Sequence, residues 1–227
     1  MGLILCLETA TPVCSVALSE NGIILSHCVD ATGYSHAERL TLLAEETLEK
    51  AGKKFSDLDA VAVSAGPGSY TGLRIGVSTA KGYCFGLNLP LISVPTLAAM
   101  TAAFQLREIY KEGFFIPMID ARRMEVFAAV FNHAGQEVQK AHAEILTEAS
   151  YSEFRKKGKV FCFGDGAKKV EGVIPGSENF ICDGTFQASA TGMAMLAEKK
   201  FTALQFEDLA YFEPFYLKEF VAGPAKK

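Results

Sequence analysis

The sequence predicts an α/β fold made of two lobes, and three observations predict it. Apolar runs of strand and helix length over residues 1–104 follow the order β-β-β-α-β-α-β-α. An Asn21-Gly22 turn separates the second and third runs, which is a strong hairpin signal. Residues 105–227 repeat the plan in a shorter form. Three antiparallel strands followed by helix-linked parallel strands is the ribonuclease-H-like order, so we predict two such lobes, 1–104 and 105–227, with the second reduced.

The first lobe begins with three predicted strands, at Leu3–Leu7, Val13–Leu18 and Ile23–Leu25. A helix follows from Ser35, with Glu38 three residues later as in a capping box, and Gly52 ends it. One face of that helix is an amphipathic stripe of Leu40, Leu43, Ala44, Thr47, Leu48 and Ala51. Two further strands are predicted at Asp59–Ser64 and Leu91–Val94, and Pro95 opens a helix that continues to about Phe104.

The helix predicted at Tyr70–Leu87 has two distinct faces. One face is apolar and carries Leu73, Val77, Ala80, Cys84 and Leu87. The neighbouring face carries small residues and one tyrosine, at Gly72, Gly76, Thr79, Tyr83 and Gly86. Small residues on one face allow close packing inside the same chain. They equally suit a helix that is buried on two sides, against its own sheet and against a partner.

The second half is predicted to contain four strands and two helices. The strands are Phe114–Ile119, Glu125–Asn132, Glu137–Ala143 and Val160–Phe163, and the helices are Ser150–Lys157 and Ala188–Lys199. Residues 106–113 are polar enough for a crossing helix or a linker. The aromatic segment 213–220 is expected to dock on the body of the protein.

Composition narrows the classes of function. The formal charge of -4 argues against a protein whose whole surface grips nucleic acid, and it leaves a local basic patch open. The six cysteines include no C-x-x-C pair, so a zinc ribbon is not expected, and most of them lie in apolar runs as buried free thiols do. No signal peptide or membrane span is predicted, so we expect a cytoplasmic protein.

The loop from Gly66 to Gly72 is the main candidate for ligand binding. Its backbone N–H groups precede a helix and could hold a phosphate, with Gly66, Gly68, Ser69 and Thr71 as contacts. The loop is neither a Walker A motif nor a good G-x-G-x-x-G. A tight turn capped by Ser69 or Thr71 is the competing interpretation. Glu8, at the end of the first strand, could belong to the same anion or nucleotide site.

Catalytic constellations are not evident in the sequence. The histidines at 27, 36, 133 and 142 include no helical zinc pair, and there is no G-x-S-x-G elbow. Three carboxylates, those of Asp120, Asp165 and Asp183, are expected to be turn residues rather than general bases.

Three stretches together resemble the bacterial TsaB (YeaZ) family: ILCLETATPVCSVAL, SHAERLTLLAEETL and AVAVSAGPGSYTGLRIGVSTAKGYCFGLNLPLISVPTLAAM. The resemblance implies the fold of the actin, sugar-kinase and chaperone ATPases. It also implies a non-catalytic relative of the threonylcarbamoyl-transferase TsaD. Thr96 and Met100 stand where TsaD carries metal-binding histidines, and the Asp-Glu pair after the first strand of TsaD is missing. No catalytic residue and no metal are therefore expected.

The resemblance further implies a subunit required for the threonylcarbamoyladenosine modification of tRNA. Its partners would be TsaD, in a heterodimer, and the ATPase TsaE, with a homodimer when TsaD is absent. No cofactor of its own is expected, while a nucleotide at an interface shared with TsaD and direct contact with tRNA are both left open. The dimer contact would use the first two helices, through Leu40, Leu43, Thr47, Gly72, Gly76, Thr79 and Tyr83. The alternative is a nucleotide-binding, ATPase or kinase-like enzyme that uses the 66–72 loop.

Overall fold

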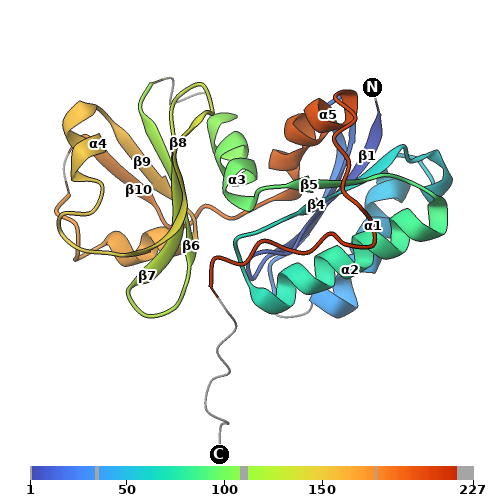
Figure 1. Ribbon diagram of the computed structural model, residues 1–227, viewed down its shortest axis with the longest axis horizontal. Helices are drawn as coiled ribbons and strands as arrows, with labels where there is room; N and C mark the ends of the chain where they lie inside the picture. Colours follow the sequence, from blue (N-terminus) through green and yellow to red (C-terminus); the bar gives the residue numbers. More distant parts are fainter. Residues whose placement is uncertain (1, 34–35, 108–111, 177, 219–227) are drawn as a thin grey trace, which may run out of the picture.

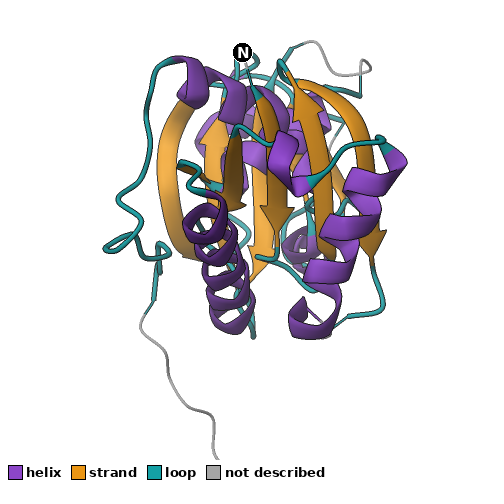
Figure 2. Ribbon diagram, turned by 90° about the vertical axis from the view of Figure 1, so that its right-hand side faces the viewer, coloured by secondary structure: helices purple, strands orange, loops and turns teal. Residues whose placement is uncertain are grey.

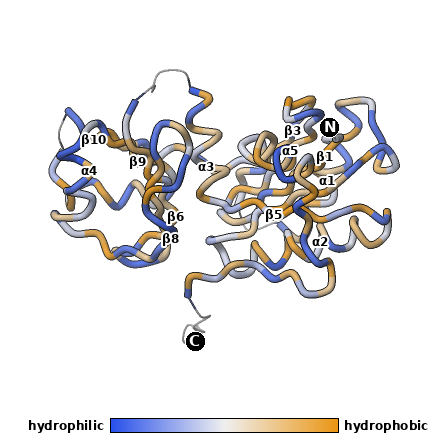
Figure 3. Tube along the Cα trace, turned by 45° about the horizontal axis from the view of Figure 1, so that its top comes forward, coloured by the Kyte–Doolittle hydropathy of each residue, from blue (hydrophilic) through white to orange (hydrophobic). Residues whose placement is uncertain are grey.

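The computed structural model describes residues 2–33, 36–107, 112–176 and 178–218. Two five-stranded sheets lie side by side, each with its own helices, and form the two lobes in Figure 1. The two-lobed α/β class is therefore confirmed. Strands β5 (Leu91–Val94) and β9 (Val160–Phe163) are strongly apolar, as the orange stretches at their labels in Figure 3 show.

The first sheet has the order β3-β2-β1-β4-β5. Its strands are β1 (Leu3–Glu8), β2 (Cys14–Glu20), β3 (Ile23–Asp30), β4 (Ala60–Ser64) and β5 (Leu91–Val94). The first three are antiparallel neighbours, whereas β4 and β5 run parallel to β1. Asn21 and Gly22 both have positive φ, as a two-residue hairpin turn requires, so the predicted meander is confirmed.

Helices cover both faces of this sheet (Figure 2). On one face, α1 (His36–Lys50) and α2 (Tyr70–Leu87) bury their apolar stripes against β1, β2 and β4. On the other face, α5 (Ala194–Thr202) and the short 3-10 helix η3 (Ala190–Met193) pack against the side chains of Ile4, Cys6 and Ala17. The predicted cap Ser35 lies outside the described residues. Another 3-10 helix, η1 (Phe55–Asp57), leads into β4.

The second sheet has the order β10-β9-β6-β7-β8. Its strands are β6 (Phe114–Asp120), β7 (Glu125–Phe131), β8 (Glu137–Ile145), β9 (Val160–Phe163) and β10 (Phe180–Asp183). The accompanying helices are α4 (Ser152–Lys157) and the 3-10 helix η2 (Asp165–Val170). The sequence prediction missed β10 because four residues without alternation give too weak a signal, and parallel pairing with β9 supplies what local sequence does not.

Helix α3 (Thr96–Gln105) joins the lobes. It follows β5 of the first sheet, and its Phe104 ring stacks on Phe163 of β9, with 3.9 Å between ring centroids. Figure 1 shows the helix between the two sheets. The structure places Pro95 at the N-cap rather than at the first helical position.

After β10 the chain returns to the first lobe. The backbone N–H of Glu207 donates to Leu91 at the edge of β5, and the N–H of Phe215 donates to the carbonyl of Ala65 at 2.7 Å. These contacts agree with a docked aromatic tail as far as residue 218. The division at residue 104 stays a prediction, and the described contacts put α5 and the tail on the first sheet.

Two cysteines depart from the free thiols that apolar runs suggest. Cys162 and Cys182 form a disulfide between β9 and β10, while Cys6, Cys14, Cys28 and Cys84 are free and buried. Residues 20 apart in sequence meet because parallel pairing places them in register. Within the described residues we find no helix with the length and apolar character that crossing a membrane requires.

Candidate functional site

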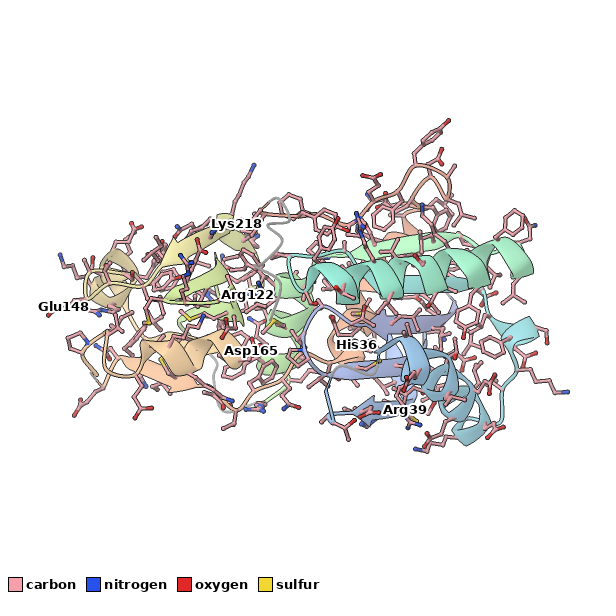
Figure 4. All side chains as sticks on the ribbon, turned by 90° about the horizontal axis from the view of Figure 1, so that it is seen from below. His36, Arg39, Arg122, Glu148, Asp165 and Lys218 are labelled. Atoms are coloured by element: carbon pink, nitrogen blue, oxygen red, sulfur yellow. A yellow bond between two sulfur atoms is a disulfide. The ribbon has the colours of Figure 1, made fainter. Side chains whose placement is uncertain are left out.

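A cleft of about 660 Å³ lies between the lobes. One wall comes from the turn after β1 and from the start of α2. The other comes from the end of β6 and the start of η2, and tail residues 216–218 close one side. Figure 4 shows His36 on the first lobe, with Arg122, Asp165 and Lys218 on the opposite side of this gap. The chemistry of the cleft depends on which of these groups are already paired.

The predicted anion loop is largely occupied by its own contacts. The Ser69 N–H donates to the Ala10 carbonyl at 2.7 Å, and the Ser69 hydroxyl accepts from the Gly72 N–H at 3.2 Å. Gly66 donates to the Thr96 hydroxyl at 3.1 Å. Ser69 therefore caps α2, as the capped-turn interpretation expects. These contacts leave the loop fewer donors for a phosphate, and the anion role of the loop, including Gly68 and Thr71, stays a prediction.

Glu8 is completely buried at the end of β1, behind the cleft wall. Its Oε1 accepts from the Ala10 N–H at 2.7 Å, and its Oε2 has no hydrogen-bond partner among the described residues. Burial raises the pKa of Glu8 to about 7, against the lowering effect of the Ala10 hydrogen bond. The side chain therefore ties the turn at residues 9–12 to the sheet, and a contact to a ligand is untested.

The opposite wall holds a small ionic cluster. Asp120 accepts from Lys169 at 2.6 Å and from the Arg122 N–H at 2.6 Å. Asp165 accepts from the Asp120 N–H at 3.1 Å, and burial raises the pKa of Asp165. Lys218 pairs with Glu125. These contacts agree with the expectation that Asp120 and Asp165 organise turns, because each carboxylate holds backbone in place.

Asp183, the third predicted turn residue, ends β10. Its Oδ1 accepts from the Thr185 and Phe186 N–H groups at 3.0 and 3.1 Å. Its other oxygen pairs with Arg107 at 2.6 Å. Burial acts to raise the pKa of Asp183, but hydrogen bonds from Thr185 and Arg107 together outweigh it and lower that pKa. No group of three or more His, Cys, Asp or Glu side chains that could hold a metal is found in the described part of the chain.

The predicted partner interface needs a correction at its glycines. A Cβ at Gly72 would lie 2.1 Å from the Thr9 carbonyl oxygen, and one at Gly76 would lie 2.2 Å from the Thr9 hydroxyl. Both glycines therefore allow α2 to approach Thr9, directly after β1 of the same chain, not a partner. Three residues of the amphipathic stripe of α1 belong to the same prediction and are also buried in the first lobe: Leu40, Leu43 and Thr47. Only Thr79 and Tyr83 of the predicted set are partly exposed.

Several exposed apolar and small residues of these two helices lie outside the predicted interface set, although Gly86 was on the predicted small-residue face of α2. Leu42 of α1 is 50% exposed and Phe85 of α2 is 84% exposed. Gly82 and Gly86 face open space, with nothing within 4 Å of an added Cβ, and Ser78 is exposed one turn before them. The sequence did contain a signal for this row of small residues, because residues 78, 82 and 86 are spaced four apart. Burial was needed to show that this glycine row, and not the 72–76 row, faces outward.

Thr96 and Met100, the two positions that the resemblance equates with metal-binding histidines, have structural roles here. Thr96 is buried, and its hydroxyl accepts the Gly66 N–H. Met100 is buried among the aromatic side chains that join α3 to the second lobe. Neither side chain is available to a ligand in the cleft.

The family model described as TsaD, tRNA N6-adenosine threonylcarbamoyltransferase, matches residues 30–220. A Haemophilus influenzae protein named tRNA threonylcarbamoyladenosine biosynthesis protein TsaB is 38% identical over 125 residues, which are 55% of this chain and 51% of that protein. The chain thus spans about half the length of this curated relative.

Solved structures are similar over nearly the whole chain. YeaZ from Pseudomonas aeruginosa superposes with a TM-score of 0.83 at 26% identity and covers 96% of this chain and 100% of that one. An inorganic polyphosphate/ATP-glucomannokinase from Arthrobacter sp. strain KM has a TM-score of 0.50 at 12% identity over 90% of this chain and all of that one. The second likeness concerns the fold alone, and it confirms the predicted sugar-kinase-like class.

Proposed function

Because the chain belongs to the family of TsaD, tRNA N6-adenosine threonylcarbamoyltransferase, and within it to the TsaB/YeaZ proteins, we propose that it takes part in tRNA threonylcarbamoyladenosine biosynthesis. Its role is that of a non-catalytic subunit. It binds and supports a TsaD-type transferase, together with the ATPase TsaE. The observation that carries this proposal is the use of Thr96 and Met100, at the metal-ligand positions of TsaD, as buried structural groups.

The surface that would receive the transferase is the outer side of α1 and α2. Ser78, Gly82 and Gly86 form a row of small residues, which permits a helix of the partner to approach closely. Phe85 and Leu42 supply exposed apolar side chains of the kind that anchor protein interfaces. We call this set, with Thr79 and Tyr83, the α1–α2 face. A homodimer through the same face forms when the transferase is absent.

Substitution of the anchors tests this assignment. We expect Phe85→Ser and Leu42→Ser each to weaken binding to the purified TsaD-type transferase by at least about tenfold, because a buried apolar anchor is worth about 1.4 kcal/mol or more. Isothermal titration or surface plasmon resonance gives the dissociation constants. Both side chains are exposed in the monomer, so the melting temperature should stay unchanged at concentrations where the chain is monomeric.

Ile145→Ser is the matched control, since Ile145 is 67% exposed on β8 of the second lobe and far along the sequence from α1 and α2. It should bind like the wild type. If Phe85→Ser and Leu42→Ser also bind like the wild type, the α1–α2 face is not the interface. If the wild-type chain shows no binding to the transferase, the subunit role itself is wrong.

A nucleotide-hydrolysing or kinase-like enzyme is the second candidate. The cleft of about 660 Å³ and the kinase-like fold favour it. We rank it below the subunit role because backbone N–H groups of the 66–72 loop already donate hydrogen bonds to Ala10, Ser69 and Thr96.

A further inference from the structure

The disulfide of the second lobe joins two neighbouring strands at matching positions. Cys162 of β9 and Cys182 of β10 are in register, with 4.6 Å between their Cα atoms. The other four cysteines are buried and free. Burial raises the pKa of Cys6 and Cys14 to about 12, which keeps those thiols protonated and inert. Redox chemistry of this chain is therefore concentrated at one pair.

The two half-cystines differ in exposure. Cys162 is fully buried in the core of the second lobe, whereas Cys182 is exposed on β10, at the edge of the sheet. Cys182 is therefore the half of the disulfide that a thiolate from solution can approach, whereas Cys162 is enclosed by the core. Exposed disulfides exchange with thiols more readily than buried ones.

Strand β10 is also the point from which the chain leaves the second lobe. Asp183, next to Cys182, pairs with Arg107 beyond the end of α3 and holds the turn that directs Phe186. The Phe186 ring packs on Phe104 and Phe163, with centroids 5.3 and 5.2 Å away. Four residues later, the Ala190 N–H donates to the Ser15 hydroxyl of the first sheet at 2.9 Å. The disulfide on β10 thus restrains the segment after β10, where the chain crosses from the second lobe to the first.

We propose that Cys162 and Cys182 form a redox-responsive modification site, opened by a dithiol that attacks the exposed Cys182. The incoming thiolate forms a mixed disulfide with Cys182, and the Cys162 sulfur leaves and takes up a proton. The second thiol of the reductant then attacks its own mixed-disulfide sulfur and releases Cys182 as a thiol. The dithiol ends as a disulfide, and its two electrons reduce the cystine. A disulfide such as oxidised glutathione reverses the reaction.

Thiol labelling of the native full chain tests the site. The protein is equilibrated with oxidised glutathione or with dithiothreitol, desalted, and exposed briefly to iodoacetamide, and the labelled cysteines are mapped by peptide mass spectrometry. We expect no rapid label on Cys182 in the oxidised protein. After reduction, Cys182 should label at least about tenfold faster than Cys162, because only Cys182 is exposed.

Hydrogen exchange measures the consequence for the crossing between lobes. Backbone amides of residues 180–190 should exchange several-fold faster in the reduced protein, while those of β1 and β4 should keep their rates. Equal exchange of residues 180–190 in both states would show that the pair does not restrain the crossing.

Two variants complete the test. Cys162→Ser should make Cys182 label rapidly without any reductant, whereas Cys84→Ser, at a buried free thiol, should label as the wild type does in both states. Rapid labelling of Cys182 in the glutathione-treated wild type would overturn the proposal, because it would mean that no disulfide forms. Failure of Cys182 to label after reduction would overturn it as well, because it would mean that the thiol is not accessible.

Discussion

At the scale of single residues, Glu8 is the most unusual group in the structure. Its carboxyl is completely buried, one oxygen holds the Ala10 N–H, and Oε2 is without a hydrogen-bond partner among the described residues. Burying a carboxylate without an opposite charge favours its protonated form. The pKa of about 7 places the change of charge within the range of ordinary buffers.

Glu8 should make the protein less stable as the pH rises. Its folded-state pKa of about 7 lies above the ordinary value of 4.5, so the folded state holds the proton more tightly. Stability contributed by Glu8 is therefore full below pH 4.5 and is lost as the pH rises to 7, by on the order of 3 kcal/mol. Glu8→Gln removes this loss, so its advantage over the wild type should grow between pH 5 and 7.5.

Urea unfolding followed by far-UV circular dichroism measures this difference, since the chain has no tryptophan for fluorescence. The comparison is the stability of the variant minus that of the wild type at each pH, which cancels the titration of other groups. A difference that stays constant across this range would contradict the assigned pKa of Glu8.

At the scale of elements, α2 uses its glycines for two purposes. Gly72 and Gly76 bring the helix against Thr9, which in turn donates its hydroxyl to the Gly72 carbonyl at 2.8 Å. Gly82 and Gly86, further along, face outward. The energetic cost of glycine in a helix is therefore offset by packing in the first half only. In the second half it stays uncompensated in the free chain, as expected for a surface that a partner covers.

The same substitution at two glycines should have opposite effects. Gly72→Ala places a methyl 2.1 Å from the Thr9 carbonyl oxygen, so we expect a loss of about 1–3 kcal/mol in the free energy of unfolding. Gly82→Ala meets nothing within 4 Å and should gain about 0.5–1 kcal/mol from helix propensity. Urea unfolding of both variants checks this. Equal effects at the two positions would disprove the inward and outward assignment.

At the scale of the whole molecule, aromatic packing around α3 holds the lobes together. Phe104 stacks on Phe163 and meets Phe115 and Phe186 at ring edges, so a helix that starts at the first sheet is built into the core of the second. The tail adds a tie across the cleft, because Phe215 bonds to Ala65 of the first lobe and Lys218 pairs with Glu125 of β7.

Removal of the central ring should destabilise the joined molecule. Phe104→Ala deletes a side chain that is 2% exposed and is expected to lower the free energy of unfolding by about 3–5 kcal/mol. Leu106→Ala, two residues further on at a side chain that is 71% exposed, is the control and should change it by less than about 0.5 kcal/mol. Urea unfolding would contradict this role for α3 if the two variants were equally stable.

Much of the fold could be predicted because its elements carry strong local signals. The predicted bounds Tyr70–Leu87, Leu91–Val94 and Val160–Phe163 coincide with α2, β5 and β9. The stripe on α1 is buried as its spacing indicates. The candidate site was less predictable, because a helical wheel ranks faces by composition. Gly72 and Gly86 look alike in sequence, and only Thr9 beside one of them distinguishes their roles.

The sequence by itself therefore determined the class of fold, the hairpin at Asn21 and Gly22, the order of elements in the first lobe and the family. Each of these follows from periodicity, turn chemistry or a motif that is contiguous in the chain. Tertiary structure alone decided the outward face of α2, the pairing of Cys162 with Cys182 and the buried state of Glu8. These depend on contacts between residues distant in sequence. No local pattern encodes which surfaces meet, because that is set by packing of the whole chain.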